Sequence, residues 1–378
     1  GTAVRNNAGN LSEGQKDQIF YDSTNVDFKY QFEATTDAWR TGGSLNSGRQ
    51  EFTGAGTQTA AIAISGYLGP APSFSTAVEL YDGTSWTETA DVSTARRGIG
   101  GLGIYTAALA AGGSTGTSAT PVVASNESWN GSAWTELNDL NTARGNPGTG
   151  GTTTAGLLYG GATAPATGAT ESWNGSVWTE VNDMNTARDI AEGDGTATSA
   201  LSVAGYTGSA ATGNVESWNG SSWTETTNVN TTRYYLACAG ADNTSLLAFG
   251  GTSPTTGKTE EWNGSSWTEV NDLSTARNSL AGNGTATAAL AYGGGPGTIT
   301  ATEEWNADTP VGAWSTTTAM NGSIYNRGSI GIKTSALAVG GRPPSSATNE
   351  QWNGSTWTEL NDLNTARHSM STSGTTTS

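Results

Sequence analysis

The sequence predicts an all-β protein assembled from repeated four-stranded sheets. One text of roughly 45 residues returns along the chain and is clearest in Glu127–Arg144 (ESWNGSAWTELNDLNTAR) and Glu171–Arg188 (ESWNGSVWTEVNDMNTAR). All 14 tryptophans lie in these copies. The apolar runs are short and do not recur with the period of an amphipathic helix. Four short strands in a repeat of this length are typical of the blade of a β-propeller.

Each repeat contains four predicted strands, termed a to d. The a strand follows an arginine and is spaced by glycines, as in Ser279–Gly284. The b strand is a run of small apolar residues that ends in glycines, as in Ala288–Gly294. The c strand carries Glu-x-Trp and the d strand carries Trp-Thr-Glu. An Asn-Gly pair between c and d predicts a tight hairpin in which both turn residues take positive φ.

Eight arginines precede an a strand, and seven of them open a complete a-b-c-d set. The seven are Arg49, Arg96, Arg144, Arg188, Arg233, Arg277 and Arg327. The d strands are expected at Trp39, Trp86, Trp134, Trp178, Trp223, Trp267, Trp314 and Trp357. Trp39 is therefore a d strand without a set of its own, and residues 368–374 (HSMSTSG), after Arg367, are an unmatched a strand.

The chain ends are expected to complete an eighth blade. Residues 19–22 against residues 27–31 read as a hairpin that could supply the missing b and c strands. We therefore expect residues 1–16 to be a linker and residues 17–378 to form an eight-bladed propeller. In this scheme residues 17–41 join the closing blade; seven blades are the alternative.

Composition excludes several classes of function. The chain has 33 acidic and 16 basic residues, a net charge of −17, which opposes binding to the phosphates of nucleic acids. No apolar run reaches the roughly 18 residues of a membrane-spanning helix, so no membrane insertion is expected. The single histidine, His368, removes most metal-site chemistry and most Ser-His or Cys-His chemistry, and Cys238 is the single cysteine. We expect no catalytic residue and no cofactor.

The recurring residues are interpreted as structural, because a catalytic group is needed once and an architectural group in every blade. We expect a charge-assisted hydrogen bond between the c-strand glutamate and the arginine, or from the arginine to loop carbonyls. The tryptophans should fill the space between sheets. The residues named for this role are Glu127, Arg144, Glu171, Arg188, Glu216, Arg233, Trp134 and Trp178.

Recognition is expected on the irregular loops. In an up-and-down sheet the b–c and d–a loops share one end, and loops on a rigid scaffold commonly carry function. The b–c loops differ between copies in length and content, unlike the repeated a–b and c–d turns. Their aromatic and cationic residues outside the repeat are Tyr67, Phe74, Tyr206, Lys258 and Arg342. These five are the candidate binding residues, although the loops could equally be plain linkers.

The repeat resembles the kelch family of β-propellers. The resemblance rests on Gly160-Gly161 after strand b, Glu171-x-Trp173 in strand c, Trp178 in strand d and Arg188 before the next a strand. It covers roughly residues 39 to 370 and implies four-stranded blades. Galactose-oxidase relatives of that family need copper held by histidines, which this chain does not supply.

The beginning of the chain resembles structural proteins of marine tailed bacteriophages. Residues 13–32 (EGQKDQIFYDSTNVDFKYQF) and the following AWRTGGSLNSGRQEFTGAGTQTAAIAISGY carry the resemblance. It implies a virion surface appendage or tail-fibre component that joins other virion proteins and recognises a glycan or protein on the host cell. Association with further copies of the chain stays open.

Two rival functions remain. The first is a bacterial extracellular propeller that binds glycan or protein. The second is a hydrolase or lyase, which needs two carboxylates about 5–10 Å apart. Glu192 and Asp194, in one a strand, are the only channel acids that qualify for inspection. If the protein is not an enzyme, Glu192→Gln leaves any measured glycan cleavage unchanged.

Overall fold

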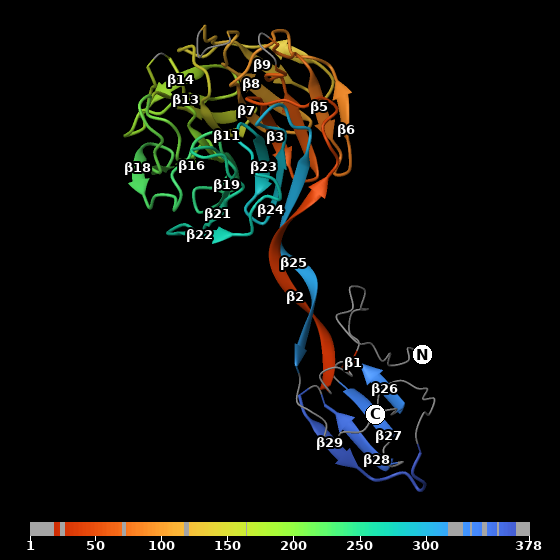
Figure 1. Ribbon diagram of the computed structural model, residues 1–378. Helices are drawn as coiled ribbons and strands as arrows, with labels where there is room; N and C mark the ends of the chain where they lie inside the picture. The colour runs from red at the N-terminus through yellow and green to blue at the C-terminus, as the bar shows by residue number, and fades with distance from the viewer. Residues whose placement is uncertain are drawn as a thin grey trace. The chain divides into compact units, whose positions relative to one another are not determined.

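The structure is a computed structural model that describes residues 19–22, 27–69, 73–116, 121–163, 165–316, 328–332, 335–341, 346–353 and 355–367. This part of the chain is all-β and contains no helix. It forms six four-stranded antiparallel sheets and one five-stranded sheet (Figure 1), an arrangement consistent with a β-propeller-like repeat. The chain divides into a larger unit, residues 37–308, and a smaller unit, residues 1–36 with 309–378.

Five sheets of the larger unit are formed by four consecutive strands each. Sheet 1 is β3 (Thr53–Thr57), β4 (Ala60–Ile64), β5 (Val78–Tyr81) and β6 (Trp86–Thr89). Sheet 2 is β7 (Gly100–Ile104), β8 (Ala107–Ala111), β9 (Asn126–Trp129) and β10 (Trp134–Glu136). Sheet 3 is β11 (Gly148–Thr152), β12 (Ala155–Tyr159), β13 (Thr170–Trp173) and β14 (Trp178–Val181). Sheet 4 is β15 (Glu192–Thr196), β16 (Ser199–Val203), β17 (Val215–Trp218) and β18 (Trp223–Thr226). Sheet 5 is β19 (Ala237–Asp242), β20 (Ser245–Phe249), β21 (Thr259–Trp262) and β22 (Trp267–Val270).

Sheet 6 takes two strands, β1 and β2, from the N-terminal end of the chain. Its strand order is β23 (Ala281–Thr285), β24 (Ala288–Tyr292), β25 (Thr302–Thr316), β2 (Asp27–Gly42) and β1 (Ile19–Asp22). The predicted N-terminal hairpin is confirmed, since Ile19 to Asp22 pair with Tyr30 to Asp27.

The place of β2 corrects two predictions. Trp314 was expected in a separate d strand, but it belongs to the continuous strand β25. The position of the d strand, next to β25, is occupied by β2, which contains Trp39. The reason lies in the sequence: this copy has Asn306-Ala307 where the others have Asn-Gly or Asp-Gly, so no hairpin turn forms. β2 is consequently not the d strand of a separate eighth blade, and residues 368–374 lie outside the described residues.

The c–d hairpins use the predicted Asn-Gly pair with a different geometry. In sheet 3, Gly175 has a φ of 91°, whereas Asn174 does not take positive φ. Asn174 Oδ1 instead accepts hydrogen bonds from the backbone N–H groups of Ser176 and Val177, both at 2.9 Å. The loop thus contains four residues and is held by an asparagine side chain that mimics a backbone turn.

The core lies between neighbouring sheets, and each b strand supplies its buried centre. In β12 and in β24, for example, each of the last four residues is buried. Each cluster of buried apolar residues draws on two sheets that follow one another in sequence, with one exception. That exception joins Ala61, Ala63 and Trp86 of sheet 1 to Leu290 and Tyr292 of sheet 6.

Polar contacts also connect sheet 1 with sheet 6. Trp86 Nε1 donates to Thr302 Oγ1 at 3.0 Å, and Tyr81 donates its hydroxyl to Glu304 Oε1 at 2.8 Å. The innermost strands β3 and β23 lie side by side, as do β3 and β7. Sheet 1 therefore has neighbours on both of its faces.

The smaller unit contains one further sheet with the same strand order. It consists of β26 (Gly328–Ile332), β27 (Ser335–Gly341), β28 (Ser346–Trp352) and β29 (Trp357–Leu360). In this sheet Trp352 pairs with Trp357 across the c–d hairpin, as Trp173 and Trp178 do in sheet 3. The repeat thus keeps its local structure in both units.

Candidate functional site

The loops that connect successive sheets carry buried ion pairs. In each of sheets 1 to 6 the arginine before the a strand contacts the c-strand glutamate of the same sheet. The pairs are Arg49–Glu79, Arg96–Glu127, Arg144–Glu171, Arg188–Glu216, Arg233–Glu260 and Arg277–Glu303. The guanidinium–carboxylate distance is 2.6 Å for Arg144–Glu171 and 2.7 Å for Arg188–Glu216.

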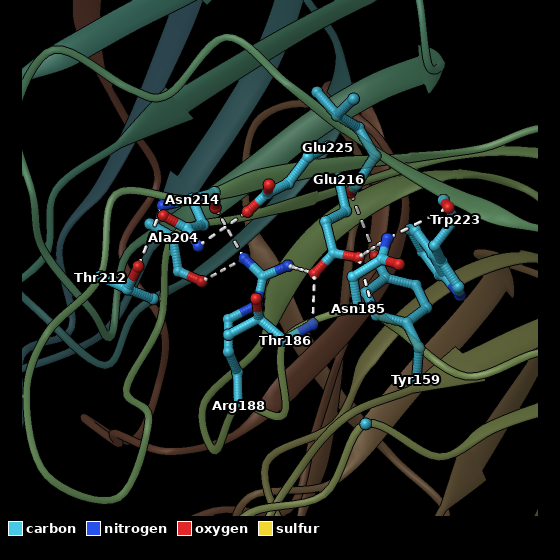
Figure 2. Close-up of polar contacts among 12 residues, drawn as sticks. Tyr159, Asn185, Thr186, Arg188, Ala204, Thr212, Asn214, Glu216, Trp223 and Glu225 are labelled. Carbon is cyan, nitrogen blue, oxygen red and sulfur yellow. Dashed lines mark hydrogen bonds and ion pairs between the residues drawn. The ribbon is translucent and has the colours of Figure 1, made fainter.

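Figure 2 shows how one pair fixes its loop. Arg188 Nη1 donates to the carbonyl oxygens of Ala204 at 2.9 Å and Asn214 at 2.6 Å, and both atoms belong to the ends of the b–c loop. Glu216 Oε2 accepts from the backbone N–H of Asn185 at 2.7 Å and from its side-chain amide at 2.9 Å. Burial lowers the pKa of Arg188. The same contacts recur around the unit, so these groups hold the scaffold and are not available for chemistry.

The repeated tryptophans also lie in the scaffold. Trp178 is buried, and its ring centroid lies 5.3 Å from that of Trp173 across the hairpin. Trp134 is half-buried, lies 5.5 Å from Trp129 and donates to the carbonyl oxygen of Ala90 at 3.0 Å.

The structure does not gather the candidate binding residues into one place. Tyr67 and Phe74 face each other across the b–c loop of sheet 1, with ring centroids 5.9 Å apart. Lys258 pairs with Glu269 of the outer strand β22 at 2.9 Å, and Tyr206 lies in the b–c loop of sheet 4. Arg342 lies outside the described residues.

A second set of equivalent residues surrounds the inner ends of the d–a loops. It consists of the residue two positions after each arginine, and we call it the mouth: Glu51, Gly98, Asn146, Ile190, Tyr235 and Ser279. All six have a φ between 51° and 56°, a conformation that is unfavourable for residues other than glycine.

Backbone hydrogen bonds link the mouth residues from sheet to sheet. The N–H of Gly98 donates to Glu51 at 2.8 Å, that of Asn146 to Gly98 at 2.7 Å, and that of Ser279 to Tyr235 at 2.8 Å. The N–H of Glu51 donates to Ser279 at 3.0 Å and so joins sheet 1 to sheet 6. The unusual backbone conformation is therefore stabilised by contacts between sheets.

The mouth carries polar and aromatic side chains that do not follow the repeat. Glu51 forms an ion pair with Arg97, and burial raises the pKa of Glu51 while Arg97 opposes this shift. Asp189 Oδ1 accepts a hydrogen bond from Asn146 Nδ2 at 3.2 Å, and burial raises the pKa of Asp189. Asp189 lies in the loop before sheet 4, and Tyr235 is the mouth residue of the next sheet, sheet 5.

Below the mouth, the a strands enclose a cavity of about 100 Å³. Each of sheets 1 to 6 contributes, through Gly54, Gly101, Gly148, Glu192, Cys238 and Gly282 among others. Glycine is required here because the sheets approach closely: a Cβ on Gly54 would lie 1.7 Å from the Tyr292 hydroxyl.

The two channel acids predicted from the sequence both line this cavity. Desolvation raises the pKa of Glu192 to about 8 and that of Asp194 to about 7. Asp194 accepts backbone hydrogen bonds from Gly195 at 2.7 Å and from Gly240 of sheet 5 at 3.0 Å. The carboxyl group of Glu192 has no hydrogen-bond partner among the described residues. The neutral form of Glu192 is thus favoured near pH 7, and Asp194 gains or loses its proton around that pH.

Sequence reasoning missed the mouth, although the sequence contains a signal for it. Strict repeats surround the arginine on its N-terminal side, but the two residues after it change in every copy: QE, RG, GN, DI, YY and NS for the six sheets. Alignment of the copies on their arginines would have selected Asp189, Tyr234 and Tyr235.

No protein-family model matches this chain, and a search of curated proteins finds no match. The described residues contain no helix that could cross a membrane. They also contain no group of three or more histidine, cysteine, aspartate or glutamate side chains that could hold a metal ion.

Proposed function

We propose that sheets 1 to 6 close into a six-bladed β-propeller, with β2 as the outer strand of the sixth blade. The contacts of sheet 1 support closure, since Trp86 and Tyr81 bond to Thr302 and Glu304 of sheet 6. The Glu51–Ser279 backbone bond supports it at the mouth. Closure of this kind places strands from both ends of the unit in one blade and protects the sheet edges.

We further propose that this propeller is a non-catalytic recognition module of a virion surface appendage or tail fibre. The observation that carries the binding role is the contrast between the two classes of loop residue. The Arg–Glu pairs and turns are used identically in every sheet, whereas the b–c loops and the mouth differ from sheet to sheet. The virion location rests on the resemblance of residues 13–32 and the segment after them to phage structural proteins.

A catalytic function is disfavoured by the size of the cavity. Pockets that hold small-molecule ligands measure about 300–1,000 Å³, but the space beside Glu192 and Asp194 is about 100 Å³. A glycosidic bond with a sugar on each side does not fit in a cavity of this volume. Glu192→Gln should accordingly leave any glycan cleavage by the purified protein unchanged, and loss of such cleavage would make the protein an enzyme.

Immunogold labelling of purified phage particles with antibody against the chain tests the virion role. Gold at fibre tips or capsid protrusions supports the appendage. Unlabelled particles with gold on bacterial cells would replace it with the bacterial extracellular binding propeller.

The recognition role is tested by competition. Purified protein should reduce phage adsorption to host cells, and the Tyr67→Ala/Phe74→Ala variant should compete less well. Ile104→Ala is the matched control, because Ile104 is 52% exposed and lies at the a–b turn, on the other end of the sheets. Equal competition by both variants would exclude the loop of sheet 1 from recognition.

A further inference from the structure

We propose that a tyrosine platform at the mouth, formed by Tyr206, Tyr234 and Tyr235 beside Asp189, binds the ring of a neutral sugar. This inference rests on the proposed recognition function and names its ligand class. The rings of Tyr206 and Tyr234 have centroids 5.3 Å apart, and those of Tyr234 and Tyr235 lie 5.4 Å apart. All three side chains are half-buried and so keep exposed surface.

Asp189 is fixed next to this platform. Its backbone exchanges two hydrogen bonds with Tyr206, at 2.7 Å and 2.9 Å. Its carboxylate accepts from the amide of Asn146 on the neighbouring sheet at 3.2 Å. A carboxylate held by an amide therefore lies near Tyr235 and is bonded through its backbone to Tyr206.

The platform is not required by the scaffold. At the positions equivalent to Tyr234 the other sheets have Gln50, Arg97, Gly145, Asp189 and Asn278. Those residues make the same backbone bridge to the b–c loop without an aromatic ring. Tyr235 moreover holds a φ of 54°, where a bulky residue is uncommon. Three adjacent tyrosines that architecture does not demand indicate a binding surface.

The chemistry of the platform fits a sugar. A pyranose has an apolar face of C–H groups that can stack on an aromatic ring, and hydroxyl groups at its edge that bond to carboxylate and amide oxygens. Binding sites commonly combine aromatic walls with a few polar groups that fix orientation. Tyrosine offers both an apolar face and a polar tip.

The charges and the ring arrangement favour a neutral ligand. Asp189 and the net charge of −17 oppose an anionic sugar, whereas Glu51 and Arg97 offset each other in their ion pair. A quaternary ammonium group is usually surrounded by separate aromatic faces. The three tyrosines instead pack on one another with interplanar angles of 46° and 44°, which gives a stepped surface and not an enclosing cage.

The test measures binding of methyl glucoside, methyl galactoside and methyl mannoside to the full chain. Saturation-transfer NMR detects the binding, and titration calorimetry gives its Kd. Choline and N-acetylneuraminic acid are the cationic and anionic comparison probes. Tyr234→Ala and Asp189→Asn should each raise the Kd for the bound sugar roughly tenfold or more. Tyr105→Ala is the control, because Tyr105 lies in the a–b turn of sheet 2 and should bind like the original protein.

Thermal unfolding of each variant separates lost binding from lost folding, and Asp189→Asn preserves the shape of its side chain if Tyr234→Ala unfolds. Binding of a neutral sugar that both mouth variants weaken, and Tyr105→Ala does not, supports the proposal. No binding of a neutral sugar, binding that Tyr234→Ala leaves unchanged, or binding of choline alone would overturn it. If the antibody labels virions but the chain binds no neutral sugar, this inference is wrong and the proposed function stands.

Discussion

Replacement of Arg188 by methionine should destabilise the larger unit by about 3–5 kcal/mol, because it leaves Glu216 as an uncompensated buried charge. The structure gives the same size by a second route (Figure 2). The change removes one hydrogen bond to a carboxylate and two to carbonyl oxygens. Such bonds contribute about 1.5–3 and about 0.5–1.5 kcal/mol each. Guanidinium chloride unfolding followed by tryptophan fluorescence measures the loss.

Arg40→Met is the matched control for this experiment. Arg40 also contacts a buried carboxylate, that of Glu304, but the Arg40 side chain is 66% exposed and Glu304 keeps its hydrogen bond from Tyr81, so the loss of Arg40 should cost less than the loss of Arg188. Adding Glu216→Gln to Arg188→Met removes the unpaired charge and keeps an acceptor for Asn185, so the double variant should recover part of the stability. If Arg188→Met costs no more than Arg40→Met, the buried pairs do not hold the loops.

Three further outcomes are expected. In the folded state the raised pKa values keep Glu192 and Asp194 protonated at a pH where the same groups of the unfolded chain are already ionised. The free energy of unfolding should therefore fall by a few kcal/mol as pH rises from about 5 to about 8. A denaturation series in which Glu192→Gln loses stability with pH as steeply as the original protein would contradict this. Trp86→Ala should cost about 3–5 kcal/mol in chemical unfolding, since it leaves a cavity between sheets 1 and 6, and half-buried Trp134→Ala should cost less; the reverse order would argue against closure. A chain of residues 37–308 should unfold in one cooperative transition by calorimetry, and failure to fold alone would show that this unit depends on the rest of the chain.

The local structure was predictable because it depends on short sequence patterns within each repeat. Runs of small apolar residues predicted the b strands, and Asn-Gly pairs predicted the c–d hairpins, such as the one at Asn174. The Arg188–Glu216 contact followed from its recurrence. These features depend on neighbours within one repeat, and the repetition of the copies makes their pattern visible.

The features that failed depend on distant parts of the chain. The loss of glycine at Ala307 was visible, but the sequence does not show that β2 replaces the missing strand. The channel position of Glu192 and Asp194 was anticipated, whereas the mouth was not. Tyr234 and Asp189 lie on different sheets, and their proximity depends on how the sheets pack.

The pairing of β2 in sheet 6 constrains the order in which the sheets can form during synthesis of the chain. Arg40 and Glu304, which contact each other in that sheet, are 264 positions apart. On the ribosome the first strand of the larger unit emerges long before its partner β25 exists. Five sheets can assemble while β2 waits with an unpaired edge, and such edges invite pairing with another chain. The synthesis of β25 therefore decides whether β2 pairs within its own chain before it pairs with a neighbouring chain.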